Sequence, residues 1–206
     1  MKNETNNKVS FVGRVCSRVQ FSHTVYSEDF YCFDISVERL SGNSDILPVI
    51  VSKRLLWEEL PVGCRVRLSG QLRSYNMVHQ GKSRLVLKIF ARELEICGDE
   101  PDENTVQLQG FLCKPPVYRT TPFCREISDI LLAVNRSYGK SDYIPCICWG
   151  RNARFCSNMD ISQYVAVSGR LQSRVYEKVI DGTVEQRTAY EVSVNRLTTD
   201  PEEELN

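Results

Sequence analysis

Apolar and polar or small residues alternate along several short stretches of the chain, and a period of two is typical of strands with one buried face. In the first half of the chain these stretches are residues 9–15, 33–37, 65–69 and, less strictly, 85–90. In the second half they are residues 106–112, 129–135, 143–149, 164–169 and 189–197. Two further segments are predicted as short helices, residues 53–60, which Pro61 ends, and residues 151–159.

The second half of the chain repeats the first. At an offset of 97 residues no gap is needed between residues 9 and 52, and short insertions carry the match to the end of each copy. The positions that match are Val9, Gly13, Arg39, Gly42, Asp45 and Pro48 in the first copy, and Val106, Gly110, Arg136, Gly139, Asp142 and Pro145 in the second. A register kept over this length predicts two homologous domains.

Taken together with the repeat, these stretches predict five short strands in each copy, with one short helix after the third strand. This order is that of the OB-fold, a small Greek-key barrel. We predict an all-β protein with two tandem five-stranded OB-fold barrels. The predicted boundaries are a polar segment at 1–7, a first barrel at 8–97, an acidic linker at 98–104, a second barrel at 105–199 and an acidic tail at 200–206.

The composition is that of a soluble globular protein, with 42% hydrophobic and 25% charged residues. No apolar run approaches the roughly 18–20 residues that span a bilayer, and the polar start MKNETNNKVS lacks the apolar core of a secretory signal. We therefore expect a cytoplasmic protein. The nine cysteines, without the spacing of a zinc knuckle, are expected to be reduced thiols that mostly fill the core. Neither a metal site nor a cofactor is predicted.

The net charge of zero conceals an uneven distribution. Each predicted barrel carries a net charge of +4, whereas the segments GDEPDEN (98–104) and DPEEELN (200–206) each carry −4. Two mildly basic domains support nucleic-acid binding weakly. Enzymatic function is not expected, because the chain has no phosphate-binding loop, zinc-protease or serine-hydrolase motif and two histidines in all.

Aromatic and cationic residues interleave along the second copy. Single-stranded nucleic acid is held by such a combination, because bases stack on aromatic faces while Lys and Arg follow the phosphates. Packing of these aromatic rings in the core or at a sheet edge remains the alternative. The candidate binding residues of this copy are Arg136, Tyr138, Lys140, Tyr143, Trp149, Arg151, Arg170, Arg174, Tyr176 and Lys178.

The second copy resembles the bacterial single-stranded DNA-binding protein family. The resemblance lies in the runs LAVNR (132–136), DYIPCICWGRNA (142–153), VSGRLQSRVY (167–176) and RTAYEV (187–192). It implies that Tyr143, Trp149 and Tyr176 occupy base-stacking positions, with Tyr138 as a fourth. It also implies a homodimer that brings four barrels together, whereas the short acidic tail of this chain departs from the long flexible tail with an acidic tip that is typical of the family.

The first copy lacks three of these aromatic residues, because Ser41, Ile46 and Ser52 stand where Tyr138, Tyr143 and Trp149 stand in the second. Its candidate binding residues are Arg73 and Tyr75. The predicted function is sequence-tolerant binding of single-stranded DNA in replication, recombination or repair, with RNA not excluded. The alternative is an adaptor or primosome-type accessory protein that acts through protein contacts, including contacts with replication or repair proteins.

Overall fold

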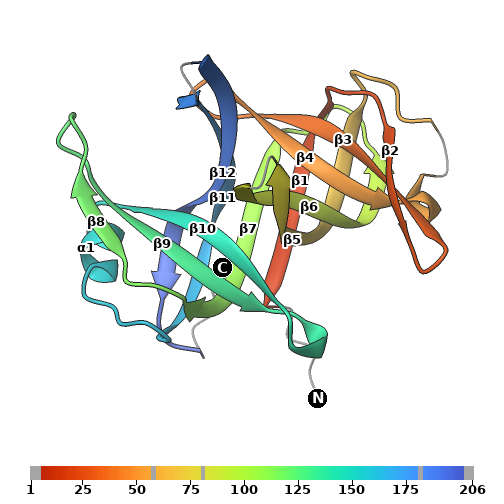
Figure 1. Ribbon diagram of the computed structural model, residues 1–206. Coiled ribbons are helices and arrows are strands. Elements are labelled where there is room, and N and C mark those ends of the chain that lie inside the picture. Colours follow the sequence, from red (N-terminus) through yellow and green to blue (C-terminus); the bar gives the residue numbers. More distant parts are fainter. Residues whose placement is uncertain (1–5, 57–58, 80–81, 181–182, 202–206) are drawn as a thin grey trace.

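The computed structural model describes residues 6–56, 59–79, 82–180 and 183–201, and the fold is all-β (Figure 1). The strands of the N-terminal half are β1 (Asn7–Val15), β2 (Gln20–Val25), β3 (Glu28–Glu38), β4 (Ser44–Ser52), β5 (Arg65–His79) and β6 (Lys82–Ile96). Those of the C-terminal half are β7 (Glu103–Leu112), β8 (Val117–Thr120), β9 (Glu126–Asn135), β10 (Ser141–Trp149), β11 (Tyr164–Ile180) and β12 (Thr183–Thr198). The short helical elements are η1 (Lys53–Leu55), η2 (Ser137–Gly139) and α1 (Arg151–Cys156).

The two halves have the same strand pairings. In the N-terminal half the order is β2-β3-β4-β6-β5-β1, and in the C-terminal half it is β8-β9-β10-β12-β11-β7. The β4–β6 and β10–β12 pairs are parallel. Additional β1–β3 and β7–β9 pairings close each half on itself, so the inward-facing apolar residues predicted from the alternation are buried.

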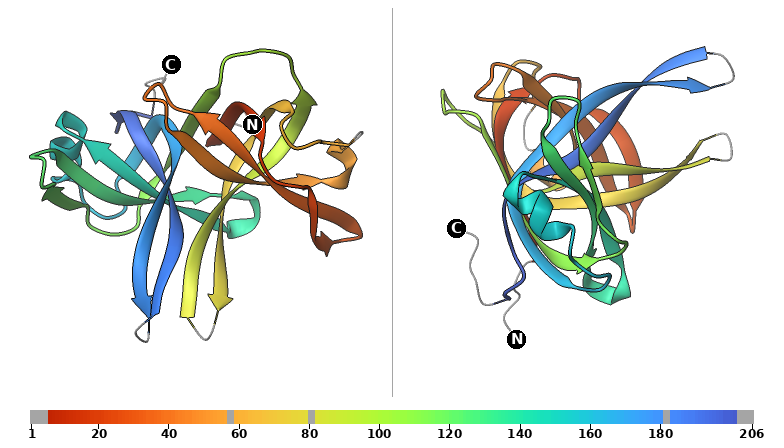
Figure 2. Two further views of the ribbon diagram at one scale, coloured as in Figure 1. Left: turned by 90° about the horizontal axis from the view of Figure 1, so that it is seen from above. Right: turned by 90° about the vertical axis from the view of Figure 1, so that its left-hand side faces the viewer.

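Strands β1 and β7 join the halves into one twelve-stranded sheet. They pair antiparallel, and Val9 lies opposite Val106, its own counterpart in the repeat. The two halves are therefore related by an approximate two-fold axis at this pair. The long hairpins β5–β6 and β11–β12 project in the same direction and lie side by side (Figure 2). There the Arg84 guanidinium donates to the backbone carbonyl of Thr188.

A reciprocal pair of buried carboxylates holds the halves together. The Asp142 carboxylate has no exposed surface and accepts hydrogen bonds from Arg136, from the Ser74 backbone N–H at 2.6 Å and from Arg73 at 2.9 Å. In the mirrored arrangement Asp45 accepts from Arg39 and from the Ser173 backbone N–H. We call these two networks the inter-half clamps.

The clamps explain why an arginine and an aspartate recur six residues apart in both copies. The Arg39 and Arg136 guanidinium groups reach the backbone carbonyls of Ser173 and Ser74, each in the opposite half. Hydrogen bonds to the paired aspartates raise the pKa of both arginines, so both remain cationic. The two arginines therefore join one half to the other.

The structure corrects the prediction of five strands in each copy, because strands β2 and β8 make six. Neither added strand has a buried residue, so its sequence lacks the alternation that reveals the others. The predicted helices are also shorter. Residues 53–60 form one 3-10 turn, Lys53–Leu55, because Leu56 leaves helical geometry, and residues 57–58 lie outside the described part. The helix predicted at 151–159 ends at Cys156.

The acidic segment 98–104 packs against the N-terminal half. The Asp102 carboxylate accepts hydrogen bonds from the Arg65 guanidinium and from the Glu38 backbone N–H at 2.6 Å. The Asn104 side chain, already within β7, bonds the backbone N–H and carbonyl of Leu171 at 2.8 Å each. This segment thus fixes where the second set of strands begins.

The prediction that the cysteines mostly fill the core is wrong. All nine are free thiols, but full burial is limited to Cys146, Cys148 and Cys156. Of the others, four directly flank a strand, where side chains reach the surface: Cys16, Cys64, Cys97 and Cys113. The sulfur atoms of Cys148 and Cys156 lie 3.5 Å apart, which packs α1 against β10.

Gly169 stands at a bulge where β11 and β12 approach each other closely. A Cβ atom there would collide with the backbone carbonyl of Ser193, which cannot move without disturbing the strand. We expect Gly169→Ala to lower the free energy of unfolding by about 1–3 kcal/mol, as overpacking does. Thermal unfolding of this variant is compared with that of Gly98→Ala, whose added Cβ meets no atom within 4 Å. Equal stability of the two variants would refute the packing argument.

Candidate nucleic-acid interface

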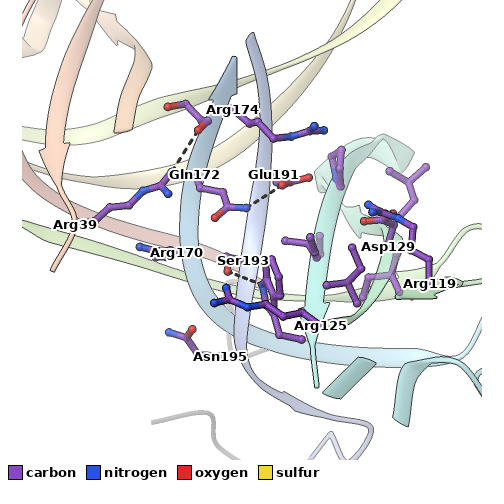
Figure 3. Close-up of a pocket in the computed structure, with 18 of the residues that line it drawn as sticks. Arg39, Arg119, Arg125, Asp129, Arg170, Gln172, Arg174, Glu191, Ser193 and Asn195 are labelled. Atoms are coloured by element: carbon purple, nitrogen blue, oxygen red, sulfur yellow. Dashed lines mark hydrogen bonds and ion pairs between the residues drawn. The ribbon is translucent and has the colours of Figure 1, made fainter. Parts of the chain in front are cut away.

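A groove with a volume of about 1140 Å³ runs over the outer face of strands β9, β10, β12 and β11. We call it the C-terminal groove. Residues of the N-terminal half, Arg39, Leu40 and Leu85, border it as well. Figure 3 shows Arg39 on one side and Arg119 with Asp129 on the opposite side, with Gln172, Glu191 and Ser193 between them.

The floor of the groove combines apolar side chains with fixed polar ones. Ile127, Pro145 and Ile147 line it, and the Trp149 ring is 37% exposed. The Trp149 Nε1–H donates to the Ser193 hydroxyl at 3.1 Å, which holds the indole ring at the end of β10. A flat, anchored and partly exposed ring of this kind can stack on a nucleobase.

The walls of the groove are predominantly cationic, with six basic side chains against the two carboxylates of Asp129 and Glu191: Arg39, Lys114, Arg119, Arg125, Arg170 and Arg174. Arg119 is paired with Asp129 at 2.8 Å, and Glu191 accepts from the Gln172 amide at 2.8 Å. Arg125 and Arg174 are exposed and have no carboxylate partner among the described residues. They are available to a phosphate.

The structure brings Trp149, Arg170 and Arg174, three of the residues predicted to bind DNA, together in the groove. Tyr143 and Tyr176 lie outside its lining. Alternate residues of a strand share one face, so Tyr143 on β10 and Tyr176 on β11 lie on the same face of the sheet as the groove. Tyr143 is 45% exposed, and the Arg174 guanidinium lies 5.8 Å from the centre of the Tyr176 ring.

Other candidates lie apart from the groove. Lys178 is exposed near the end of β11, Arg151 is exposed at the start of α1, and Lys140 is exposed just after η2. The side chain of Tyr138 lies outside the described part of the structure. Their predicted contacts with DNA stay predictions.

Of the three remaining candidates, Arg73 and Arg136 belong to one inter-half clamp, and Tyr75 follows Ser74 of that clamp in the chain. Arg73 and Arg136 are bound to Asp142, and burial raises the pKa of the nearby Tyr75 phenol. The clamp gives both arginines a structural role. Tyr75 keeps 37% of its surface exposed.

Sequence reasoning missed the cations of the β8–β9 hairpin. Arg119 and Arg125 come from the segment VYRTTPFCRE (117–126), which also presents Phe123 with 87% of its surface exposed. This stretch interleaves cations and aromatic residues as the later candidates do, so the same signal was present in the sequence. Its strand, β8, lacks the alternation from which a strand beside β9 could have been predicted.

Neither a metal site nor a membrane-spanning helix is found among the described residues. No cluster of three or more His, Cys, Asp or Glu side chains there could hold a metal ion. Among the same residues, no helix has the length and apolar character needed to cross a membrane.

Comparison with known sequences finds a matching family profile and several relatives. The profile of the single-strand binding protein family matches residues 103–200. The chain is 40% identical to single-stranded DNA-binding protein 1 of Staphylococcus aureus (strain COL) over 81 residues, 36% of this chain and 48% of that protein. It is 36% identical to single-stranded DNA-binding protein B of Bacillus subtilis (strain 168) over 84 residues, 36% of this chain and 72% of that protein.

Comparison with solved structures covers both halves. The crystal structure of wild-type single-stranded DNA binding protein from Thermus aquaticus superposes with a TM-score of 0.75 and 19% identity, over 97% of this chain and 95% of that chain. At this identity the likeness concerns the fold, and the predicted all-β OB-fold class is confirmed. The chain spans about half the length of the Staphylococcus aureus relative, but 72% of the Bacillus subtilis protein. From this coverage and the profile match, the chain belongs to the single-strand binding protein family.

Proposed function

We propose that this protein binds single-stranded DNA without strong sequence preference, with the C-terminal groove as the principal site. The observation that carries the proposal is the anchored, partly exposed Trp149 ring on the floor of a groove with cationic walls. A base stacked on an aromatic ring contributes about 1–3 kcal/mol whatever its identity, because every base has a π-face. The names of the relatives support the same function.

The groove favours a single strand over a duplex for a physical reason. Stacking on Trp149 requires a base whose face is free, and paired bases in a duplex are already stacked on their neighbours. The surrounding guanidinium groups of Arg125, Arg170 and Arg174 supply contacts to the backbone phosphates. Base stacking does not distinguish ribose from deoxyribose, so we expect single-stranded RNA to bind as well, with an affinity equal to or lower than that of DNA.

We further propose that the chain forms two OB-fold domains. The strand pairings support a start of the second domain at Glu103, within the segment expected from the sequence to be a linker. We also propose a homodimer, in which four barrels come together to bind one strand in replication, recombination or repair. Light scattering of the free protein measures this state, and a mass of one chain contradicts it.

Salt dependence tests the proposed mode of binding. Fluorescence anisotropy of a labelled oligo-dT should give an association constant that falls with salt, with a log–log slope of about −2 to −4 for three to five phosphate contacts at about 0.7 each. Arg125→Ala should make this slope shallower by about 0.7. Arg14→Ala, a change of an exposed cation on β1, serves as the control. Binding to duplex DNA as tight as to oligo-dT would contradict the proposal.

A further inference from the structure

The outer face of the N-terminal half carries a group of aromatic rings that no alignment of the two copies reveals. The rings of His23 and Phe30 stack with centres 5.2 Å apart and planes 13° apart. The Phe90 ring lies 5.8 Å from Phe30, and the Arg92 guanidinium lies 5.2 Å from the centre of the Phe90 ring. We call His23, Phe30 and Phe90 the N-terminal aromatic cluster.

Strand register places this cluster where the C-terminal groove has Trp149. In the C-terminal half, Trp149 pairs with Ile127 across β9–β10, and Ser193 lies on the parallel neighbour β12 opposite Ile147. In the N-terminal half the corresponding pairs are Ser52 with Phe30 and Phe90 with Ile50.

The serine and the aromatic ring have therefore exchanged strands. Trp149 on β10 donates to Ser193 on β12, whereas the equivalent positions of the N-terminal half hold Ser52 on β4 and Phe90 on β6. The aromatic ring that alignment of the two copies does not find on β4 is supplied by the neighbouring strand β6.

The cluster faces away from the barrel interior. The neighbours of Phe90 on β6, Ile89 and Ala91, are buried at 0% and 2% exposure, so alternation directs Lys88, Phe90 and Arg92 outward. All three ring residues keep part of their surface exposed, as does Trp149. Partly exposed rings on an outer face are available to a ligand.

Charge around the cluster points to a phosphate-bearing ligand. Lys88 and Arg92 flank Phe90 on the same face, where the C-terminal half has Glu191 and Asn195. The nearby Glu28 carboxylate accepts a hydrogen bond from the Ser52 hydroxyl and lies 3.5 Å from the Arg54 guanidinium, so its charge is balanced. Neither Lys88 nor Arg92 is ion-paired within the described residues, so a purely apolar partner would leave both without counter-charges.

We propose that the N-terminal aromatic cluster, with Lys88 and Arg92, is a second base-stacking site for single-stranded DNA. This inference rests on the proposed function and extends it to the N-terminal half. In that half the residues equivalent to Tyr143 and Trp149 are not aromatic. The bases stack against Phe90 and Phe30, while Lys88 and Arg92 hold the adjoining phosphates. The two halves then bind DNA through similar outer faces with rings drawn from different strands.

Photocrosslinking of the full chain tests the site directly. An oligo-dT that carries 5-iododeoxyuridine is irradiated with the protein, and the crosslinked peptides are identified by mass spectrometry. We expect crosslinks in two regions, around Trp149 and at Phe30 or Phe90. Phe90→Ser, which installs the residue found at 193, should remove the crosslinks of the second region and keep those at Trp149. The variant Lys88→Glu with Arg92→Glu, which spares the ring, should do the same.

Affinity measurements give an independent readout. In a Trp149→Ala background, adding Phe90→Ser should weaken binding of a short oligo-dT by about five- to hundredfold, the range for loss of one stacked base. Lys8→Glu, an exposed cation on β1, should leave that affinity unchanged. Crosslinks confined to the Trp149 region would overturn the second site and leave the proposed function intact. Absence of any crosslink together with absence of binding would overturn the proposed function itself.

Discussion

Replacing Asp142 by alanine is expected to lower the free energy of unfolding by about 3–5 kcal/mol, the range for a buried ion pair that loses one partner. The Asp142 carboxylate is fully buried and accepts hydrogen bonds from both Arg73 and Arg136. Without it the two guanidinium groups, whose side chains are 15% and 24% exposed, remain cationic with no counter-charge. The Ser74 backbone N–H loses its acceptor at the same time.

Urea unfolding followed by circular dichroism measures this loss. The matched control is Glu95→Ala, because Glu95 is paired with Arg67 on the surface, with side chains 58% and 45% exposed. Removing one partner of such an exposed pair should cost little, because solvent screens the interaction. If Asp142→Ala is no more destabilising than Glu95→Ala, the inter-half clamp does not stabilise the fold.

Combining Trp149→Ala with Arg119→Glu and Arg125→Glu is expected to weaken binding of oligo-dT more than about a hundredfold. Loss of the stacking ring accounts for about 1–3 kcal/mol of this change. The two charge reversals remove phosphate contacts from one wall of the C-terminal groove and introduce repulsion there. Since all three residues are exposed, the fold should be little affected.

The control for this triple variant reverses two exposed cations on β1, Lys8 and Arg14, which lie outside the groove lining. Circular dichroism confirms that both variants are folded, and fluorescence anisotropy gives their affinities at one fixed salt concentration. An equal loss of affinity in the triple variant and the control would show that net charge, rather than the groove, determines binding.

The sequence predicted the central strands because their alternation reflects a real difference between two faces. Along β9, Ile130, Leu132 and Val134 are buried while the residues between them are less so. Strands β2 and β8 escaped prediction because no residue in them is buried, and both are held by pairing to β3 and β9. Arg119 was not predicted as a binding residue for the same reason, because its place beside the groove depends on the pairing of β8 with β9.

Contacts between distant segments give some candidate residues a structural role that the sequence does not predict. The sequence predicts that Arg73 and Arg136 bind DNA. In the structure both are bound by the Asp142 carboxylate, which β10 places beside β5. The N-terminal aromatic cluster was hidden for a related reason. Comparison of the two copies tests equivalent positions on one strand, whereas Phe90 fills the place of Trp149 from the parallel neighbour. Neither arrangement is visible before strand register is known.

A fluorescence titration of Trp149 tests the central claim most directly. The variant Trp57→Phe leaves Trp149 as the sole tryptophan of the chain. If the C-terminal groove binds single-stranded DNA by stacking, oligo-dT should quench this fluorescence to saturation, less strongly as salt increases, and duplex DNA should not. Unchanged Trp149 fluorescence at low salt, while oligo-dT is bound by the protein, would contradict the assignment of the groove as the binding site.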